Sequence, residues 1–131
     1  MTMKSGLDDY AAMIGVAAAD GAILELPFSA QVEGRTGFFH GGVIAGLLEM
    51  AAWQCVRSIV TTDILPTPIV TTITYLRGAR PGTLHAAAES TFRTRRLLHI
   101  GAVAWQDHRD RPIVEAKWQF LLPDRGFDRV G

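Results

Sequence analysis

The sequence predicts an α+β fold in which antiparallel strands curl around one long helix. Residues 41–58 lack proline and are rich in Leu, Ala, Met and Ile, which favours a helix, whereas the later segments alternate apolar and polar residues as strands do. The chain has 131 residues, of which 48% are hydrophobic and 20% charged. This length and composition predict one packed domain over residues 1–131 and exclude a disordered or collagen-like chain.

The first elements are a short helix and a hairpin. Residues 5–13 begin with a serine that can cap a helix and place acidic residues in its first turn. Residues 14–19 and 22–28 flank the dipeptide Asp20-Gly21, which suits a tight turn between antiparallel strands. Residues 29–39 carry glycines without a sustained period, so we expect a loop that leads into the long helix.

The long helix carries apolar residues on every face, and such a helix is normally buried on all sides. We therefore expect other elements to wrap around it. These apolar residues are Val43, Ile44, Leu47, Leu48, Met50, Ala51, Trp53 and Val56.

The second half of the chain predicts the strands that wrap the helix. They are residues 69–76, 83–92, 97–106 and 113–122, joined by residues 61–68, 77–82 and 107–111. In the strand 83–92 we expect one covered face and one wet face, the wet one formed by Thr83, His85, Ala87, Glu89 and Thr91. Because such a sheet has exposed edges, we expect a homodimer that shares its sheet.

Charge and cysteine content limit the partners and the compartment. Thirteen Lys and Arg balance thirteen Asp and Glu, so no overall charge attracts nucleic acid or an anionic membrane. Cys55 is the only cysteine, which excludes an internal disulfide and is compatible with a reducing compartment. Lys4 and Asp8 interrupt any secretory signal pattern, and residues 43–56 are shorter than the ~20 that span a bilayer. We expect a cytoplasmic protein.

Glu49 is the anomaly in this pattern. Apart from His40, it is the only ionisable side chain between Thr36 and Cys55, and it falls in the middle of the helix predicted to be buried. An unpaired carboxylate in an apolar interior costs several kcal/mol, so it needs a partner, a cavity or a chemical role. One interpretation is structural: Glu49 lies at a helix–helix or dimer seam, and Arg57, Thr72 or a backbone amide satisfies the carboxylate.

The other interpretation is catalytic. At about 100° per residue, Glu49 lies on the same helix face as Gly42 and near Ala45 and Gly46, whose small side chains would leave a groove. The motif His40-Gly41-Gly42 begins this helix, where free N–H groups and the dipole favour an oxyanion. Acyl transfer needs such donors together with a carboxylate that attacks the carbonyl or activates water. The glycines could equally serve only the turn that starts the helix.

These residues carry a family resemblance. His40-Gly41-Gly42-x-x-x-x-Leu47-x-Glu49, followed by Ile73-Thr74-Tyr75-Leu76-Arg77, resembles the hotdog-fold acyl-CoA thioesterases of the phenylacetate-degradation type. The resemblance covers nearly the whole chain. It implies a central helix wrapped by an antiparallel sheet, homodimers that often pair into tetramers, active sites shared across the dimer interface, and no metal or tightly held cofactor.

The resemblance also implies roles for the motif residues. The Gly41 N–H would bind the thioester carbonyl, with Gly42 beside it, and Glu49 of the facing subunit would act as nucleophile or general base. His40 would hold the loop. The substrate would be an acyl-CoA, hydrolysed to a free acid and CoA.

Four further residues are predicted to bind substrate. Gly34 occupies the position where many relatives carry an Asn or Gln that orients water or the carbonyl. Relatives often place a Ser or Thr near the start of the strand that ends in Tyr-Leu-Arg. This chain has Pro68 there, with Thr67 and Thr71 beside it, and Thr71 is the residue predicted to bind substrate. Arg95 and Arg96 would bind the phosphates of coenzyme A, although a solvated strand end explains them equally well.

Two other functions remain open. A noncatalytic acyl-CoA or fatty-acyl binding protein would be stabilised by ligand without turnover. A dehydratase of hydroxyacyl thioesters would use His40 and Glu49 as its acid–base pair. The remaining histidines, His85, His99 and His108, show no metal-ligand spacing, so we expect no metal site.

Overall fold

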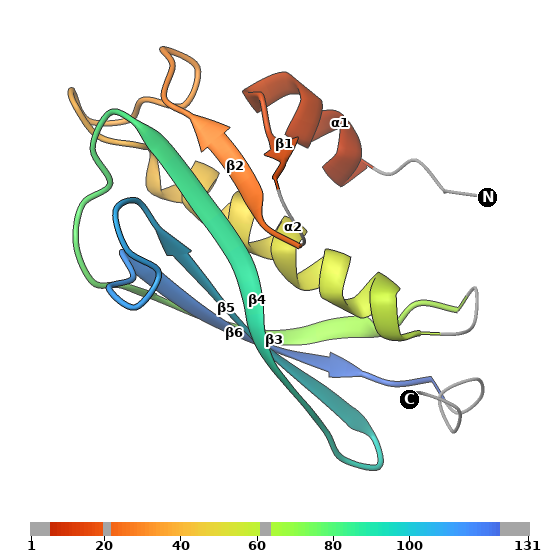
Figure 1. The fold of residues 1–131 in the computed structure, drawn as a ribbon. Helices are drawn as coiled ribbons and strands as arrows, with labels where there is room; N and C mark the ends of the chain where they lie inside the picture. Colours follow the sequence, from red (N-terminus) through yellow and green to blue (C-terminus); the bar gives the residue numbers. More distant parts are fainter. Residues whose placement is uncertain (1–5, 20–21, 61–63, 124–131) are drawn as a thin grey trace.

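The computed structural model describes residues 6–19, 22–60 and 64–123 and shows a six-stranded antiparallel sheet packed on one long helix (Figure 1). The spatial strand order is β1-β2-β4-β5-β6-β3, with α2 lying across the sheet (Figure 1). In these residues no helix is both long and apolar enough to cross a membrane. The elements in chain order are α1 (Gly6–Ile14), β1 (Ala17–Ala18), β2 (Leu24–Pro27), α2 (Gly41–Ile59), β3 (Thr67–Tyr75), β4 (Thr83–Arg93), β5 (Leu97–Trp105) and β6 (Val114–Leu121).

The helix α2 confirms the predicted long helix and supplies the centre of the core. Leu47, Leu48 and Ala52 are fully buried where α2 meets the sheet. Burial on all sides, however, is wrong for this chain, because Gly42, Glu49 and the last-turn Arg57 are exposed. Residues 42, 49 and 57 lie on one side of a helix at about 100° per residue, so α2 has one stripe that the rest of the chain leaves open.

The N-terminal helix α1 lies against α2 and covers part of that side. The ring of Tyr10 sits directly on Gly46, where a Cβ atom would come within 2.8 Å of the Tyr10 Cε2. The groove predicted along Gly42, Ala45 and Gly46 is therefore partly filled. The predicted hairpin is confirmed as β1 and β2, which pair antiparallel, and its turn residues 20–21 lie outside the described part of the chain.

The strand β4 departs from the simple alternation predicted for it. Its register with β5 shifts between Ala88 and Ser90, where a bulge interrupts the alternation, and residues 89–92 are all exposed. Phe92, expected on the covered face, is 66% exposed. Ala87, expected on the wet face, is only 2% exposed because it packs with Val103 and Trp105 in a second small apolar cluster.

The edge strand β3 pairs only with β6, so its other side carries unpaired backbone groups. It starts at Thr67 and thus includes Pro68, which was expected in the preceding connection. Proline is tolerated in a strand at a sheet edge or a bulge, and the register here shifts between Pro68 and Val70. Ile69 and Val70 remain 49% and 45% exposed, which leaves an apolar open edge.

Candidate functional site

The first candidate site is a hollow at the start of α2, which we call the helix-start hollow. It has a volume of about 340 Å³ and lies between the loop before α2 and the segment that follows β3. Its walls include Gly34, His40, Gly41, Tyr75 and Arg77.

Hydrogen bonds at the helix start leave one backbone donor free. The His40 Nδ1 caps the helix by accepting from the Gly42 N–H at 2.9 Å, and the His40 carbonyl accepts from the amides of Val43 and Ile44 at 3.0 and 3.1 Å. Because Nδ1 accepts, the neutral ring carries its proton on Nε2. In residues 6–19, 22–60 and 64–123 the Gly41 N–H finds no acceptor. A free amide at the positive end of a helix is suited to bind an oxyanion.

Gly34 and His40 are locked together in the wall of this hollow. The His40 N–H donates to the Val32 carbonyl at 2.7 Å, and the Gly34 N–H donates to the Phe38 carbonyl at 3.0 Å. A Cβ on residue 34 would lie 2.9 Å from the His40 Cα, so only glycine lets the two backbones pass this closely. Gly34 is thus in the predicted place, where it gives the backbone room rather than a polar side chain.

Tyr75 is a residue of this site that the sequence analysis left without a role. Its hydroxyl donates to the Gly41 carbonyl at 2.9 Å, and its ring lies 3.6 Å from where a Gly41 Cβ would be. Tyr75 is part of the motif Ile73-Thr74-Tyr75-Leu76-Arg77, which the sequence analysis used for the family resemblance. Only the pairing of β3 with β6 and the packing of α2, however, bring the end of this strand to the helix start.

Glu49 lies in the middle of α2 and is exposed. Arg57 pairs with Asp8 at 3.8 Å, and in the described part of the chain the Glu49 carboxylate has no hydrogen bond or ion pair, so the structural interpretation finds no partner for it within one chain. Eight residues separate Glu49 from Gly41, which corresponds to about 12 Å along the helix axis.

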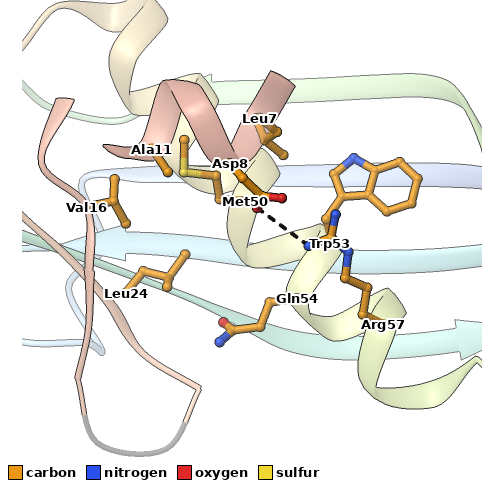
Figure 2. A pocket seen from close by; sticks show the side chains of 9 residues that line it. All are labelled: Leu7, Asp8, Ala11, Val16, Leu24, Met50, Trp53, Gln54 and Arg57. Carbon is orange, nitrogen blue, oxygen red and sulfur yellow. Dashed lines mark ion pairs between the residues drawn. The ribbon is translucent and has the colours of Figure 1, made fainter. Parts of the chain in front are cut away.

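A second cavity lies between α1 and α2, one turn beyond Glu49. Figure 2 shows Leu7, Ala11 and Leu24 around its apolar walls, with the Asp8–Arg57 ion pair at its edge. Its volume is about 240 Å³, and Met50, Trp53 and Gln54 supply the α2 side. The Oε1 of Gln54 is buried there and has no hydrogen-bond partner among the described residues.

The remaining predicted residues lie away from the helix-start hollow. Tyr75 pairs with Val114 at the helix-start end of the sheet, whereas Arg95 and Arg96 follow the end of β4 in the turn before β5, at the other end. The seven residue-to-residue steps from Val114 to Leu121, which pairs with Leu97, span about 23 Å. Thr71 lies in between, opposite Trp118 on the exposed edge strand.

The chain offers neither a cysteine nucleophile nor a metal site in its described residues. Cys55 is half-buried, and burial raises the pKa of its thiol, so little reactive thiolate is present near neutral pH. No three His, Cys, Asp or Glu side chains among residues 6–19, 22–60 and 64–123 are grouped to hold a metal ion.

The family model of the thioesterase superfamily matches residues 36–113, a segment that holds His40, Gly41, Glu49 and Tyr75. The chain belongs to the thioesterase superfamily. The matched segment begins after α1, so the Tyr10 contact and one wall of the cavity in Figure 2 lie outside it.

Similar solved structures confirm the hotdog fold. A Chromobacterium violaceum protein is 33% identical, with 88% of this chain and 83% of that chain covered and a TM-score of 0.71. A Bacillus halodurans protein crystallised with CoA is 17% identical, with 86% and 74% covered and a TM-score of 0.72. A phenylacetic acid degradation-related protein of Ralstonia eutropha is 19% identical, with 87% and 89% covered and a TM-score of 0.67. No curated protein sequence matches this chain.

Proposed function

We propose that this thioesterase-superfamily chain hydrolyses an acyl-CoA thioester to a free acid and CoA. The observation that carries the proposal is the free Gly41 N–H at the positive end of α2, on the same helix as the unpaired carboxylate of Glu49. The Bacillus halodurans relative, which was crystallised with CoA, supports coenzyme A as the thiol half of the substrate.

In the proposed reaction the thioester carbonyl oxygen accepts a hydrogen bond from the Gly41 N–H. As the carbonyl carbon is attacked, its oxygen gains negative charge, which this donor and the helix dipole stabilise. Glu49 either attacks the carbon directly, forming an anhydride that water then opens, or removes a proton from an attacking water. In both routes the C–S bond breaks, the CoA thiolate leaves and takes up a proton, and the acid is released.

The spacing within α2 supports a site shared between two chains. Gly41 and Glu49 of one helix are about 12 Å apart along the axis, whereas both must approach a single carbonyl group to within about 3 Å. Glu49 would therefore come from a second copy. The unpaired apolar edge of β3 is the surface through which we propose that a homodimer forms, with two dimers joining into a tetramer.

The cavity beside Glu49 is the proposed place for the acyl group. Trp53 and Met50 lie within one turn of Glu49, so an acyl chain that leaves the reacting carbonyl can enter between α1 and α2. An engineered cavity of about 150 Å³ in another protein holds benzene, so about 240 Å³ suits an aryl or short acyl group. Thr71, midway along the open edge of β3, is proposed to contact substrate from the dimer interface.

The test is thiol release from aryl, short-chain and medium-chain acyl-CoAs by the wild type and by Glu49→Gln. We expect turnover of at least one substrate and a loss of about 10²- to 10⁴-fold in kcat for the variant, because an amide neither attacks nor takes up a proton. Glu115→Gln, an exposed glutamate on β6, is the matched control and should stay active.

Three results would contradict this function. Full activity of Glu49→Gln would contradict the role of Glu49 as nucleophile or general base. Stabilisation by acyl-CoA with no turnover of any substrate would indicate a binding protein. Hydration of an enoyl-CoA without thiol release would indicate a dehydratase.

A further inference from the structure

A second hollow, rich in arginine, lies next to the helix-start hollow. The connection from β3 to β4 and the loop from β5 to β6 enclose it, and Figure 1 shows both segments at the end of the sheet where α2 begins. Its volume is about 740 Å³. Arg77, Arg80, Arg111 and His108 line it, and Asp107 is the only acidic side chain that the described residues contribute to its lining. We call it the basic hollow.

The two hollows adjoin each other. Arg77 and Gly78 line both of them, so a long ligand can run from the Gly41 amide into the basic hollow along one chain. The carbonyl-binding donor and the arginines thus belong to the same end of the same molecule.

Hydrogen bonds hold the two walls of the basic hollow together. The Gln106 side chain bridges to the backbone of Arg80 in both directions, accepting from its N–H at 3.0 Å and donating to its carbonyl at 2.6 Å. The Arg77 guanidinium donates to the Pro112 carbonyl across the same gap. The backbone that carries the arginines is therefore fixed before any ligand arrives.

The arginines around this hollow are unneutralised. Elsewhere Arg57 pairs with Asp8 and Arg109 with Glu89, but Arg77, Arg80 and Arg111 form no ion pair with any residue that the structure describes. The chain as a whole has no net charge, so this local excess of positive charge is a feature of the site. Clustered guanidinium groups repel one another and are suited to bind phosphate through paired N–H donors.

We infer that the basic hollow binds the phosphates of the nucleotide end of coenzyme A, through Arg80 and Arg111 with Arg77 at the junction of the two hollows. The inference rests on the proposed function for the identity of the ligand. Several cations in one hollow match the diphosphate and the 3′-phosphate of free coenzyme A better than the single phosphodiester of a carrier-protein arm. Arg95 and Arg96, which the sequence favoured for this role, lie about 23 Å away at the other end of the sheet.

The test compares Arg80→Gln and Arg111→Gln with Lys117→Gln, which removes a positive charge from β6 outside the hollow. Calorimetry would measure the Kd of CoA and of dephospho-CoA. Thiol release would give the KM of an acyl-CoA and of a truncated thioester that carries the same acyl group on N-acetylcysteamine, which lacks the nucleotide. We expect each arginine variant to raise the CoA Kd and the acyl-CoA KM about tenfold or more. Lys117→Gln should match wild type, and the truncated thioester should be hydrolysed equally by all variants.

A measurement on the wild type supports the same conclusion without any substitution. Dephospho-CoA should bind more weakly than CoA, and the difference should shrink at high salt, where exposed charges are screened. Equal affinity for the two compounds would overturn the inference.

The remaining outcomes separate this inference from the proposed function. If CoA binding depends on Arg80 and Arg111 but no thioester is hydrolysed, the inferred phosphate site is supported and the proposed hydrolase function is contradicted. If hydrolysis proceeds but the acyl-CoA KM is unchanged in Arg80→Gln and Arg111→Gln, the hydrolase function is supported and this inference is overturned. The same holds if the KM rises in Arg95→Gln and Arg96→Gln instead.

Discussion

The start and the middle of α2 are held in different ways. At the start, His40, Gly34 and Tyr75 fix the backbone around Gly41 through contacts within the chain. In the middle, Glu49 projects into solvent, and no described residue holds its carboxylate. The comparison indicates that one chain fully builds the carbonyl-binding half of the proposed site, whereas its carboxylate half depends on what covers the open stripe of α2.

The largest effect at the helix start is expected for Gly41→Pro. Proline removes the free N–H but suits the first position of a helix, and His40 already has the extended backbone (ψ 131°) that a residue before proline prefers. We expect kcat to fall about 10²- to 10³-fold, the usual cost of one oxyanion donor, with little change in Tm. Gly41→Ala keeps the N–H, meets Tyr75 only at an ordinary 3.6 Å contact, and should stay active.

Mixing two inactive variants sharpens the comparison further. If the site joins Gly41 of one chain to Glu49 of another, refolding Gly41→Pro together with Glu49→Gln creates mixed dimers with one intact site. About a quarter of wild-type activity should return, because half of the dimers are mixed and half of their sites are whole. Activity that stays at the level of the separate variants would place both groups in one chain.

A smaller loss is expected for Gly34→Ala. The added Cβ would come within 2.9 Å of the His40 Cα, so the backbone must shift and the cap on Gly42 moves with it. We expect about 1–3 kcal/mol of destabilisation and a parallel fall in kcat/KM. Gly6→Ala, whose Cβ would meet nothing within 4 Å, is the control and should change neither Tm nor activity.

Tyr75→Phe should have the smallest effect at this end. It removes one hydrogen bond to the Gly41 carbonyl and leaves the ring in place, which costs about 1 kcal/mol, or roughly a fivefold loss in kcat. Tyr10→Phe is the matched control, since its hydroxyl makes no hydrogen bond in the described part of the chain. Equal activities of the two variants would show that Tyr75 does not position Gly41.

The helix start could be predicted because it depends on neighbours in sequence. His40 and Gly41 are adjacent at a helix start, so residue type and position predicted a free backbone donor there, whereas Gly34, which a short loop brings against His40, was predicted only through the family resemblance. The exposure of Glu49 could not be predicted in this way. An apolar helix looks buried in its sequence whether the covering surface comes from the same chain or from another.

The basic hollow depends on topology in a way that no local pattern shows. Arg80 and Arg111 are distant in sequence, and the pairing of β3 with β6 and the Gln106 bridge bring their loops together. Arg95 and Arg96 looked like the better phosphate site because they are adjacent in sequence. The alternation expected in β4 likewise ends at the bulge after Ala88, since residues 89–92 are all exposed.

The separation of eight positions between Gly41 and Glu49 sets a limit on an isolated copy of the protein. A solitary, fully folded chain would carry every group the chemistry needs and still be inert, since its own carboxylate lies out of reach of the carbonyl held at its own helix start. On this arrangement, specific activity would fall on dilution before any loss of helical signal, and the cellular abundance of the chain would govern its turnover.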